Sequence, residues 1–164
     1  MSKYILNTGD TAPDIELQTW PDGFLKLSDL RGQWVVVYFY PKDNTPGCTT
    51  ESCDFRDASS DFSAADAVIL GISRDSLASH QKFAEKNGLP FQLLSDPDET
   101  ACAAFDVMQM KNMYGKQLRG VERSTFIIDP GGKIAHAWRK VKVKGHAIDV
   151  LSTLKQLQKK DSQG

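Results

Sequence analysis

The feature that most constrains the fold is an unbroken apolar run, WVVVYFY, at residues 34–40. A continuous run of β-branched and aromatic residues predicts a strand that is buried on both faces of a sheet. Residues 67–73 form a second such run, and residues 91–94 form a shorter third. Helical patterns lie between and after them, one starting at Asp75 or Ser76 and ending at Asn87 and Gly88, and a short one over 99–105. This alternation predicts right-handed crossovers and helices on both faces of a sheet.

Antiparallel hairpins are predicted near both ends of the chain. Residues 15–20 and 24–27 alternate with period two around the turn sequence Pro21-Asp22-Gly23. Residues 124–129 and 133–138 flank Pro130-Gly131-Gly132 in the same way, and an amphipathic helical stripe follows. The closing hairpin makes the predicted sheet mixed.

The composition is that of a globular protein. The chain has 164 residues, of which 40% are hydrophobic and 25% charged, enough for one domain with a real core. The net charge of -1 gives no field that would draw it to nucleic acid or to an anionic membrane. The apolar runs are too short to span a bilayer, and the N-terminus has no signal-peptide core, so we expect a cytoplasmic protein. The sequence predicts a single thioredoxin-like α/β domain over 1–164, with a central mixed β-sheet flanked by helices and an N-terminal β-hairpin.

Two of the three cysteines, Cys48 and Cys53, follow the first buried strand closely. In a reducing compartment such thiols are catalytic, metal-binding or simply buried. Thr45 and Pro46 predict a helix start, because Thr is a good N-cap and Pro is favoured at the first helical position. Cys48 would then lie in the first turn, where free backbone N–H groups and the helix dipole stabilise a thiolate, the nucleophilic form of the side chain.

Cys53 falls on the same predicted helix, and its role is open on this evidence. Five residues along a regular helix separate the two Cα atoms by roughly 8.7 Å, whereas a disulfide needs about 4.4–6.8 Å. The pair can therefore bond only if the first turns unwind. Cys53 could instead be a small hydrophobe, and a zinc site is less favoured because Cys102 and the three histidines are isolated in sequence. A thioredoxin-type oxidoreductase would carry C-x-x-C here, and that motif is absent.

The residues around Cys48 resemble a known family. Pro41-x-x-x-Thr45-x-x-Cys48 is similar to the signature of the peroxiredoxins, and the string YFYPKDNTPGCTTE at 38–51 resembles the subfamily called bacterioferritin comigratory protein, or peroxiredoxin Q. Similar strings elsewhere extend the likeness over nearly the whole chain. The resemblance implies a thioredoxin-like fold and thiol-dependent reduction of hydrogen peroxide and organic hydroperoxides.

The resemblance also implies a reaction cycle. Cys48 would be the peroxidatic cysteine, which becomes a sulfenic acid, and Cys53 would be the resolving cysteine, which closes an intramolecular disulfide. A thioredoxin- or glutaredoxin-like dithiol would reduce this disulfide, and no metal, flavin or haem cofactor is expected because sulfur carries the redox change. A general disulfide reductase and a non-enzymatic peroxide sensor are the rival functions. We expect a monomer, because the chain lacks the cysteine-bearing C-terminal arm of the decamer-forming relatives.

Four further roles are carried over by position. The Thr45 hydroxyl would hydrogen-bond the thiolate and the incoming peroxide, and Pro41 would shield the pocket from water. Arg123 would stabilise the charge that develops on the oxygens, and Glu51 would orient Arg123.

The remaining distinctive residues receive structural interpretations. Cys102 is expected to be a buried spectator and His80 a surface residue. Met108, Met110 and Met113 are expected to line or fill a loop. The basic segment at 139–144 is interpreted as a strand edge guarded by lysines, which is favoured over a nucleic-acid site.

Overall fold

The apolar run forms a strand inside the sheet of the computed structural model, which describes residues 4–21 and 23–163. This strand, β3 (Trp34–Phe39), is buried along its whole length between β4 and β8. Its side chains alternate between two hydrophobic cores: Val35 and Val37 point into one, and Val36 and Tyr38 into the other. The run has no polar residue because neither face of the strand meets water.

The main sheet has seven strands in the order β2-β1-β5-β4-β3-β8-β9. β4 and β5 run parallel to β3, and β8 runs antiparallel to it, so the predicted mixed sheet is confirmed. The N-terminal hairpin of β1 and β2 is also confirmed, although Asp22 of its predicted turn lies outside the described residues. The strands other than β3 are β1 (Glu16–Trp20), β2 (Phe24–Lys26), β4 (Ala67–Ser73), β5 (Gln92–Ser95), β8 (Ser124–Ile128) and β9 (Ile134–Trp138).

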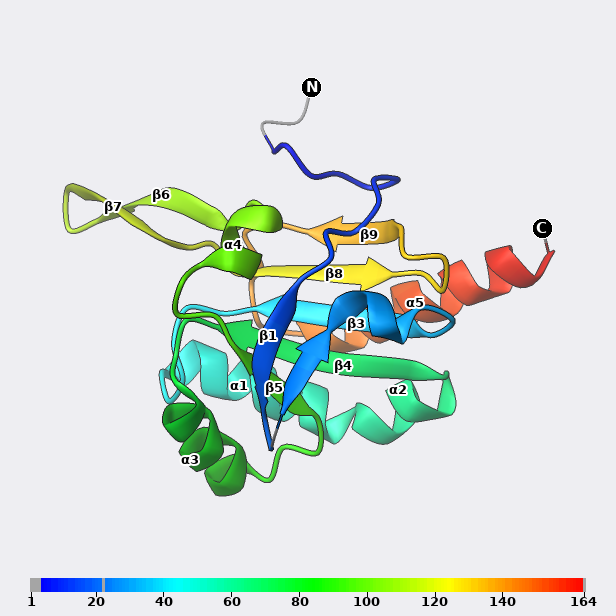
Figure 1. The fold of residues 1–164 in the computed structure, drawn as a ribbon, viewed down its shortest axis with the longest axis horizontal. Coiled ribbons are helices and arrows are strands. Elements are labelled where there is room, and N and C mark those ends of the chain that lie inside the picture. Colours follow the sequence, from blue (N-terminus) through cyan, green and yellow to red (C-terminus); the bar gives the residue numbers. More distant parts are fainter. Residues whose placement is uncertain (1–3, 22, 164) are drawn as a thin grey trace.

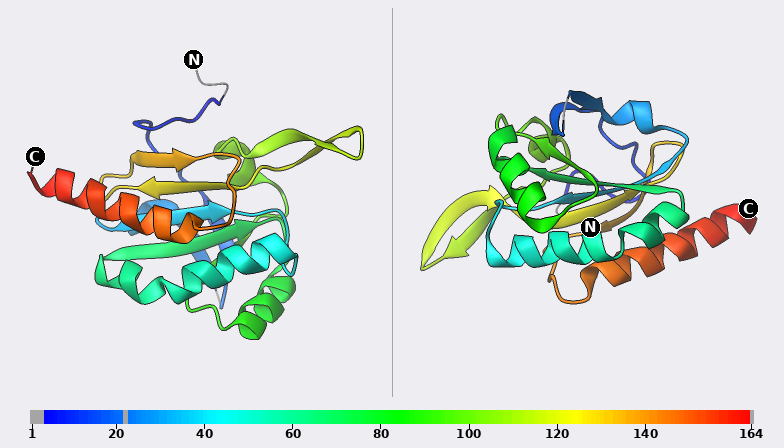
Figure 2. Two further views of the ribbon diagram at one scale, coloured as in Figure 1. Left: turned by 180° about the vertical axis from the view of Figure 1, so that it is seen from behind. Right: turned by 90° about the horizontal axis from the view of Figure 1, so that it is seen from below.

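Helices cover both faces of this sheet (Figures 1 and 2). One face is packed by α1 (Pro46–Asp57), α2 (Ser59–Ala64), α3 (Leu77–Asn87) and α5 (His146–Gln163). The other face is packed by the short helices η1 (Leu27–Leu30) and α4 (Thr100–Ala104) together with the N-terminal segment. Within the described ranges, no helix is both long enough and apolar enough to cross a membrane.

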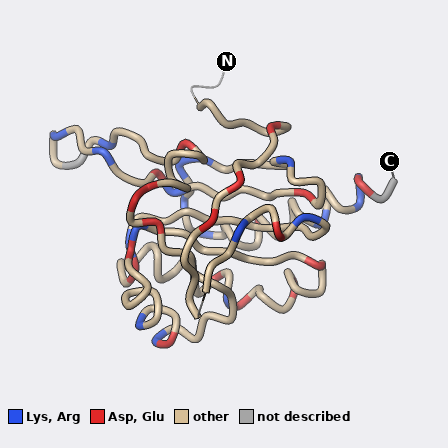
Figure 3. The backbone as a smooth tube through the Cα atoms, in the orientation of Figure 1, with Lys and Arg blue, Asp and Glu red and all other residues tan. Residues whose placement is uncertain are grey.

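A second, two-stranded sheet projects from the body of the molecule (Figure 1). It consists of β6 (Met108–Met113) and β7 (Lys116–Val121), so the loop expected around the methionines is wrong. Tyr114 and Gly115 both have positive φ, of 54° and 79°, as the tightest hairpin turns require. Lys and Arg recur along this hairpin in Figure 3, and the side chain of Met113 lies outside those the structure describes.

The basic segment at 139–144 is not a strand edge. β9 ends at Trp138, and the following residues form a connection to α5. Arg139 points inward, and its guanidinium donates hydrogen bonds to the carbonyls of Phe105, Asp106 and Leu6. The strand predicted from the period-two pattern of charges is therefore wrong. Arg139, the first of these charged residues, instead connects loops through its hydrogen bonds to their carbonyls.

A close approach between β3 and β4 gives a test of the core. A Cβ on Gly71 would lie 2.8 Å from ring atoms of Tyr38 and from Leu93. We expect Gly71→Ala to lower the free energy of unfolding by about 1–3 kcal/mol, measured by chemical denaturation, because overpacking forces the ring to move. Gly120→Ala is the matched control, since its Cβ would meet nothing nearer than Lys111 at 3.7 Å. Equal stabilities for the two variants would contradict the packing described.

Candidate active site

Cys48 lies where α1 begins, immediately after the loop that follows β3. Thr45 is the N-cap with extended backbone and Pro46 is the first helical residue, so the predicted helix start is confirmed. Cys48 lies in the first turn and is only 1% exposed. The Thr45 hydroxyl donates to the carbonyl of Lys42 at 2.8 Å and does not cap the helix. The hydrogen bond from Thr45 to the thiolate stays a prediction.

Arg123 joins Cys48 to Glu51. One terminal nitrogen of its guanidinium donates to Cys48 Sγ at 3.2 Å, and the other donates to Glu51 Oε1 at 2.6 Å. Arg123 lies in the connection between β7 and β8, whereas the other two residues lie one turn apart on α1. The structure thus brings three of the six predicted residues into direct contact. The positively charged guanidinium of Arg123 lies against the sulfur of Cys48.

The Glu51–Arg123 pair is buried, and burial governs its electrostatics. Burial raises the pKa of Glu51 from 4.5 to about 7, although Arg123 opposes the shift. Burial also lowers the pKa of Arg123, but Glu51 and Cys48 outweigh it and the net shift is upward. Glu51 Oε2 has no hydrogen-bond partner among the described residues. The arginine therefore stays charged, while the carboxyl group is close to its titration point at neutral pH.

Gly47 makes room for this arrangement, and sequence reasoning gave it no role. A Cβ at this position would lie 3.2 Å from the nearer Arg123 nitrogen, so any larger residue would press on the guanidinium. The position of Gly47 directly before Cys48 was the one signal available in the sequence.

Outside Arg123 lies a surface hollow of about 470 Å³. Pro41 lines it, in keeping with its predicted shielding role, which itself stays a prediction. The projecting hairpin contributes Lys111, whose pKa is lowered by burial and by nearby Arg123. No pattern in the sequence pointed to Lys111. The full lining is Pro41, Met110, Lys111, Asn112, Glu122, Arg123, Lys140 and Val141.

Cys53 lies further along α1 and faces α3. Its sulfur is half-buried and contacts Asn87 Oδ1 at 3.7 Å, and the Asn87 carbonyl accepts a hydrogen bond from Arg56 at 2.7 Å. Cys48 and Cys53 are free thiols on one continuous helix, so they are separated as the spacing predicts.

The remaining groups considered from sequence lie elsewhere. Cys102 is fully buried, as expected, and burial raises the pKa of its thiol. His80 is also fully buried, so its expected place on the surface is wrong. Among residues 4–21 and 23–163, no group of three or more His, Cys, Asp or Glu side chains is arranged to hold a metal ion.

Comparison with known proteins now identifies the family. Residues 8–137 match the AhpC/TSA family. The peroxiredoxin Bcp of Bacillus subtilis strain 168 is 51% identical over 155 residues, which cover 94% of this chain and 99% of that relative. The peroxiredoxin Bcp of Xanthomonas campestris pv. campestris is 59% identical over 124 residues, which cover 76% of this chain and 78% of that relative.

Solved structures agree with this match. A structure of Xanthomonas campestris peroxiredoxin Q superposes with a TM-score of 0.86 at 50% identity and covers 94% of this chain and 98% of that chain. A structure of the bacterioferritin comigratory protein of Xanthomonas campestris, solved to explain its alkyl peroxide reduction activity, superposes with a TM-score of 0.86 at 49% identity and the same coverage. These neighbours confirm the predicted thioredoxin-like fold. The chain therefore belongs to the AhpC/TSA family, and within it to the peroxiredoxins called Bcp or peroxiredoxin Q.

Proposed function

We propose that this peroxiredoxin reduces hydroperoxides with Cys48 as the attacking thiolate and Cys53 as the thiol that closes a disulfide. The observation that carries the proposal is the contact between the Arg123 guanidinium and Cys48 Sγ at 3.2 Å. A positive charge in contact with the sulfur can stabilise negative charge that the sulfur carries as the nucleophile.

In the first step, the Cys48 thiolate attacks one oxygen of the peroxide and the O–O bond breaks. The sulfur is oxidised to sulfenic acid, and the second oxygen leaves with the bonding electrons and takes up a proton to become water or an alcohol. Arg123 and the backbone N–H groups of the first turn of α1 stabilise the negative charge on the oxygens. Glu51 holds Arg123 in place through the hydrogen bond at 2.6 Å.

In the second step, Cys53 attacks the sulfenic sulfur of Cys48, water leaves, and a disulfide forms. The two cysteines cannot meet while α1 is intact, because their Cα atoms are roughly 8.7 Å apart on a regular helix. The first turns of α1 must therefore unwind. Cys53 must also leave Asn87, whose present contact at 3.7 Å holds the sulfur toward α3.

An external dithiol protein of the thioredoxin or glutaredoxin type would then reduce the disulfide by thiol–disulfide exchange. A reducing cytoplasm would supply such a protein. The alkyl peroxide reduction reported for the Xanthomonas campestris relative supports organic hydroperoxides as substrates here. The hollow of about 470 Å³ beside Arg123 has room for an organic substituent, and Cys48 lies behind Arg123 and is not among its lining residues.

The disulfide can be tested by intact mass measurement after one equivalent of peroxide. We expect the wild-type protein to lose two hydrogen atoms and Cys53→Ser to gain an oxygen atom, because the sulfenic acid then has no partner. Cys102→Ala is the control and should behave as wild type, since Cys102 is buried elsewhere. A wild-type protein that accumulates the oxygen adduct would contradict the role of Cys53. A Cys48→Ser variant that still turns over peroxide with a thioredoxin system would contradict the function itself.

A substitution can separate the geometry of the two Arg123 contacts from the charge of the side chain. Arg123→Lys keeps a positive charge but cannot reach Cys48 and Glu51 with two fixed donors. We expect the rate constant for sulfenic acid formation to fall by about 10²-fold, measured in rapid-mixing single turnovers. Arg119→Lys is the matched control, because this exposed arginine of β7 pairs with Glu99 at the start of α4, and the variant should react at the wild-type rate. Equal rates for both variants would remove Arg123 from the mechanism.

The raised pKa of Glu51 predicts a specific dependence of stability on pH. The folded state holds the Glu51 proton more tightly than the unfolded state, so this stabilising contribution is complete below pH 4.5 and is lost as pH rises through about 7. The wild-type free energy of unfolding should fall by about 3 kcal/mol relative to that of Glu51→Gln over this range. Denaturant titrations of both proteins at several pH values measure the difference. A difference that is constant with pH would mean that Glu51 is not shifted.

A further inference from the structure

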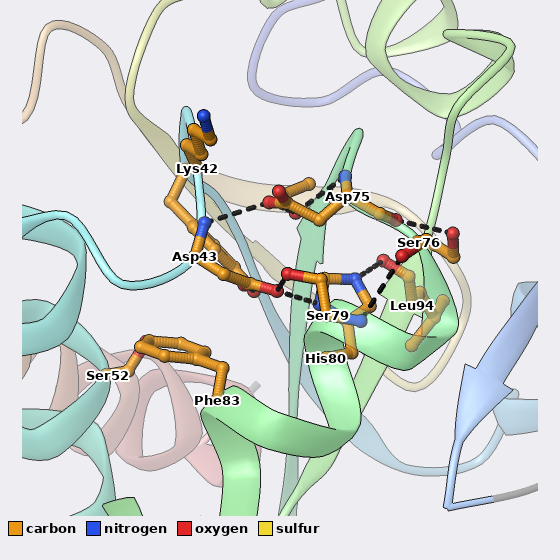
Figure 4. A network of polar contacts seen from close by, with 12 residues as sticks. Lys42, Asp43, Ser52, Asp75, Ser76, Ser79, His80, Phe83 and Leu94 are labelled. Carbon is orange, nitrogen blue, oxygen red and sulfur yellow. Dashed lines mark hydrogen bonds and ion pairs between the residues drawn. The ribbon is translucent and has the colours of Figure 1, made fainter. Parts of the chain in front are cut away.

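A second set of buried polar side chains lies beside the active-site loop and takes no part in the proposed reaction (Figure 4). We call it the Asp43 cluster, and it consists of Asp43, Tyr40, Ser79 and His80. Asp43 is 4% exposed and His80 is completely buried. Burying such groups is costly unless every polar atom is paired. A cluster of this kind next to a reactive centre therefore needs an explanation.

The Asp43 carboxylate is fully paired. Its Oδ1 accepts a hydrogen bond from the Tyr40 hydroxyl at 2.6 Å. Its Oδ2 accepts one from the Ser79 hydroxyl at 2.8 Å and lies 2.8 Å from Nδ1 of His80. These partners come from the end of β3 and from α3, so the carboxylate joins two elements that are far apart in sequence.

The two ring nitrogens of His80 have different hydrogen-bond neighbours. Nε2 lies 2.9 Å from the Leu94 carbonyl, which can only accept, so Nε2 carries a hydrogen. Nδ1 lies 2.8 Å from Oδ2 of Asp43, so one hydrogen is shared between these two atoms. His80 therefore links the carboxyl group of Asp43 to the Leu94 carbonyl on β5.

This hydrogen-bonded pair holds the loop that precedes α1. The backbone N–H of Asp43 donates to Asp75 at 2.8 Å, so the loop is tied by its main chain as well as by its side chain. Asn44 follows with a left-handed φ of 64°, and Thr45 then starts α1 while its hydroxyl bonds the Lys42 carbonyl. The position of the first turn of α1 therefore depends on the anchored Asp43.

We infer that Asp43 and His80 are positioning residues, whose hydrogen bond fixes the loop against α3 so that the start of α1 presents Cys48 to the peroxide. Neither residue touches Cys48, and both act through the loop. The inference rests on the proposed function, because it assigns the pair to the attack of Cys48 on the peroxide. Closure of the disulfide needs the first turns of α1 to leave their place, so it does not depend on the pair in the same way.

The test uses Asp43→Asn, which keeps the shape of the side chain and removes its charge. Single turnovers with hydrogen peroxide, quenched with a thiol-alkylating reagent and analysed by mass, resolve sulfenic acid formation from disulfide closure. We expect the first rate constant to fall by about ten- to a hundredfold, because a small displacement of reacting groups costs this much. The second rate constant should be unchanged or higher.

Asp96→Asn is the matched control for a general loss of stability. Asp96 is 1% exposed and accepts hydrogen bonds from two backbone N–H groups at the start of α4, away from Cys48. It should leave both rate constants at the wild-type values. Asp43→Asn with a wild-type rate of sulfenic acid formation, or with both steps slowed equally, would overturn the inference.

Two substitutions of His80 separate its hold on Asp43 from its packing. In His80→Asn the amide can donate from the position of Nδ1, toward Asp43, whereas in His80→Gln it can donate from the position of Nε2, toward Leu94. We expect His80→Asn to keep more of the rate of sulfenic acid formation than His80→Gln. Equal losses in the two variants would mean that His80 only fills space.

Nitrogen NMR of the His80 ring gives a readout independent of activity. The Nδ1 signal should differ between wild type and Asp43→Asn, because this nitrogen lies 2.8 Å from the carboxyl group of Asp43, and an unchanged signal would overturn the contact. Failure of this inference is distinguishable from failure of the proposed function. Wild type that closes the disulfide while Asp43→Asn reacts normally contradicts only the positioning role, whereas peroxide turnover by Cys48→Ser contradicts the function on which it rests.

Discussion

The guanidinium of Arg123 contacts Cys48 and Glu51 at the same time, and these contacts span 75 and 72 residues of sequence. They depend on the register between β3 and β8, in which Phe39 lies opposite Ser124. The end of β3 and the beginning of β8 therefore meet at one edge of the sheet. Arg123 directly precedes β8, and α1 follows the short loop after β3. A slip of one residue would turn the side chains of either strand to the other face and separate the site.

β3 also packs against α1. Tyr38 points from β3 into the core beneath the helix, where its ring stacks on Phe55 with centroids 4.8 Å apart. Its hydroxyl is hydrogen-bonded at 2.8 Å to Ser52, which lies between Cys48 and Cys53 in the sequence. Gly71 on the neighbouring strand leaves space for the ring. The middle of α1 is thus held by packing on Tyr38, while its first turn is also held by the polar contacts of Cys48 and Glu51 with Arg123.

The sequence predicts the parts of the fold whose signal is local. β3 and β4 were predicted because burial on both faces leaves a short apolar run, and β-branched and aromatic residues in such a run favour a strand over a helix. Cys48 at a helix start was predicted because Thr45 and Pro46 are local signals too. The hairpin of β6 and β7 was missed, because its strands are rich in Lys, Gln and Met and lack the β-branched pattern.

Residues whose place depends on distant partners could not be found in the same way. His80 was assigned to the surface because histidine in a helix is usually exposed, and its carboxylate partner is 37 residues away in sequence. Arg123 could be chosen among the arginines only from the family resemblance. Lys111 gave no signal at all, because its approach to the hollow depends on where the projecting hairpin leaves the sheet.

In the proposed cycle, the start of α1 must hold Cys48 for the attack on the peroxide and must then unwind so that the disulfide can close. A threonine N-cap that bonded the first turn would add about 1 kcal/mol to helix stability, but here its hydroxyl is committed to Lys42. The first-turn N–H groups are then left to stabilise negative charge on the sulfur and the peroxide oxygens. Glu51 is buried with one oxygen unpaired among the described residues, which lowers the stability of the same segment further. In the proposed cycle this weakness is necessary, because a firmly capped helix would keep Cys48 and Cys53 too far apart to bond.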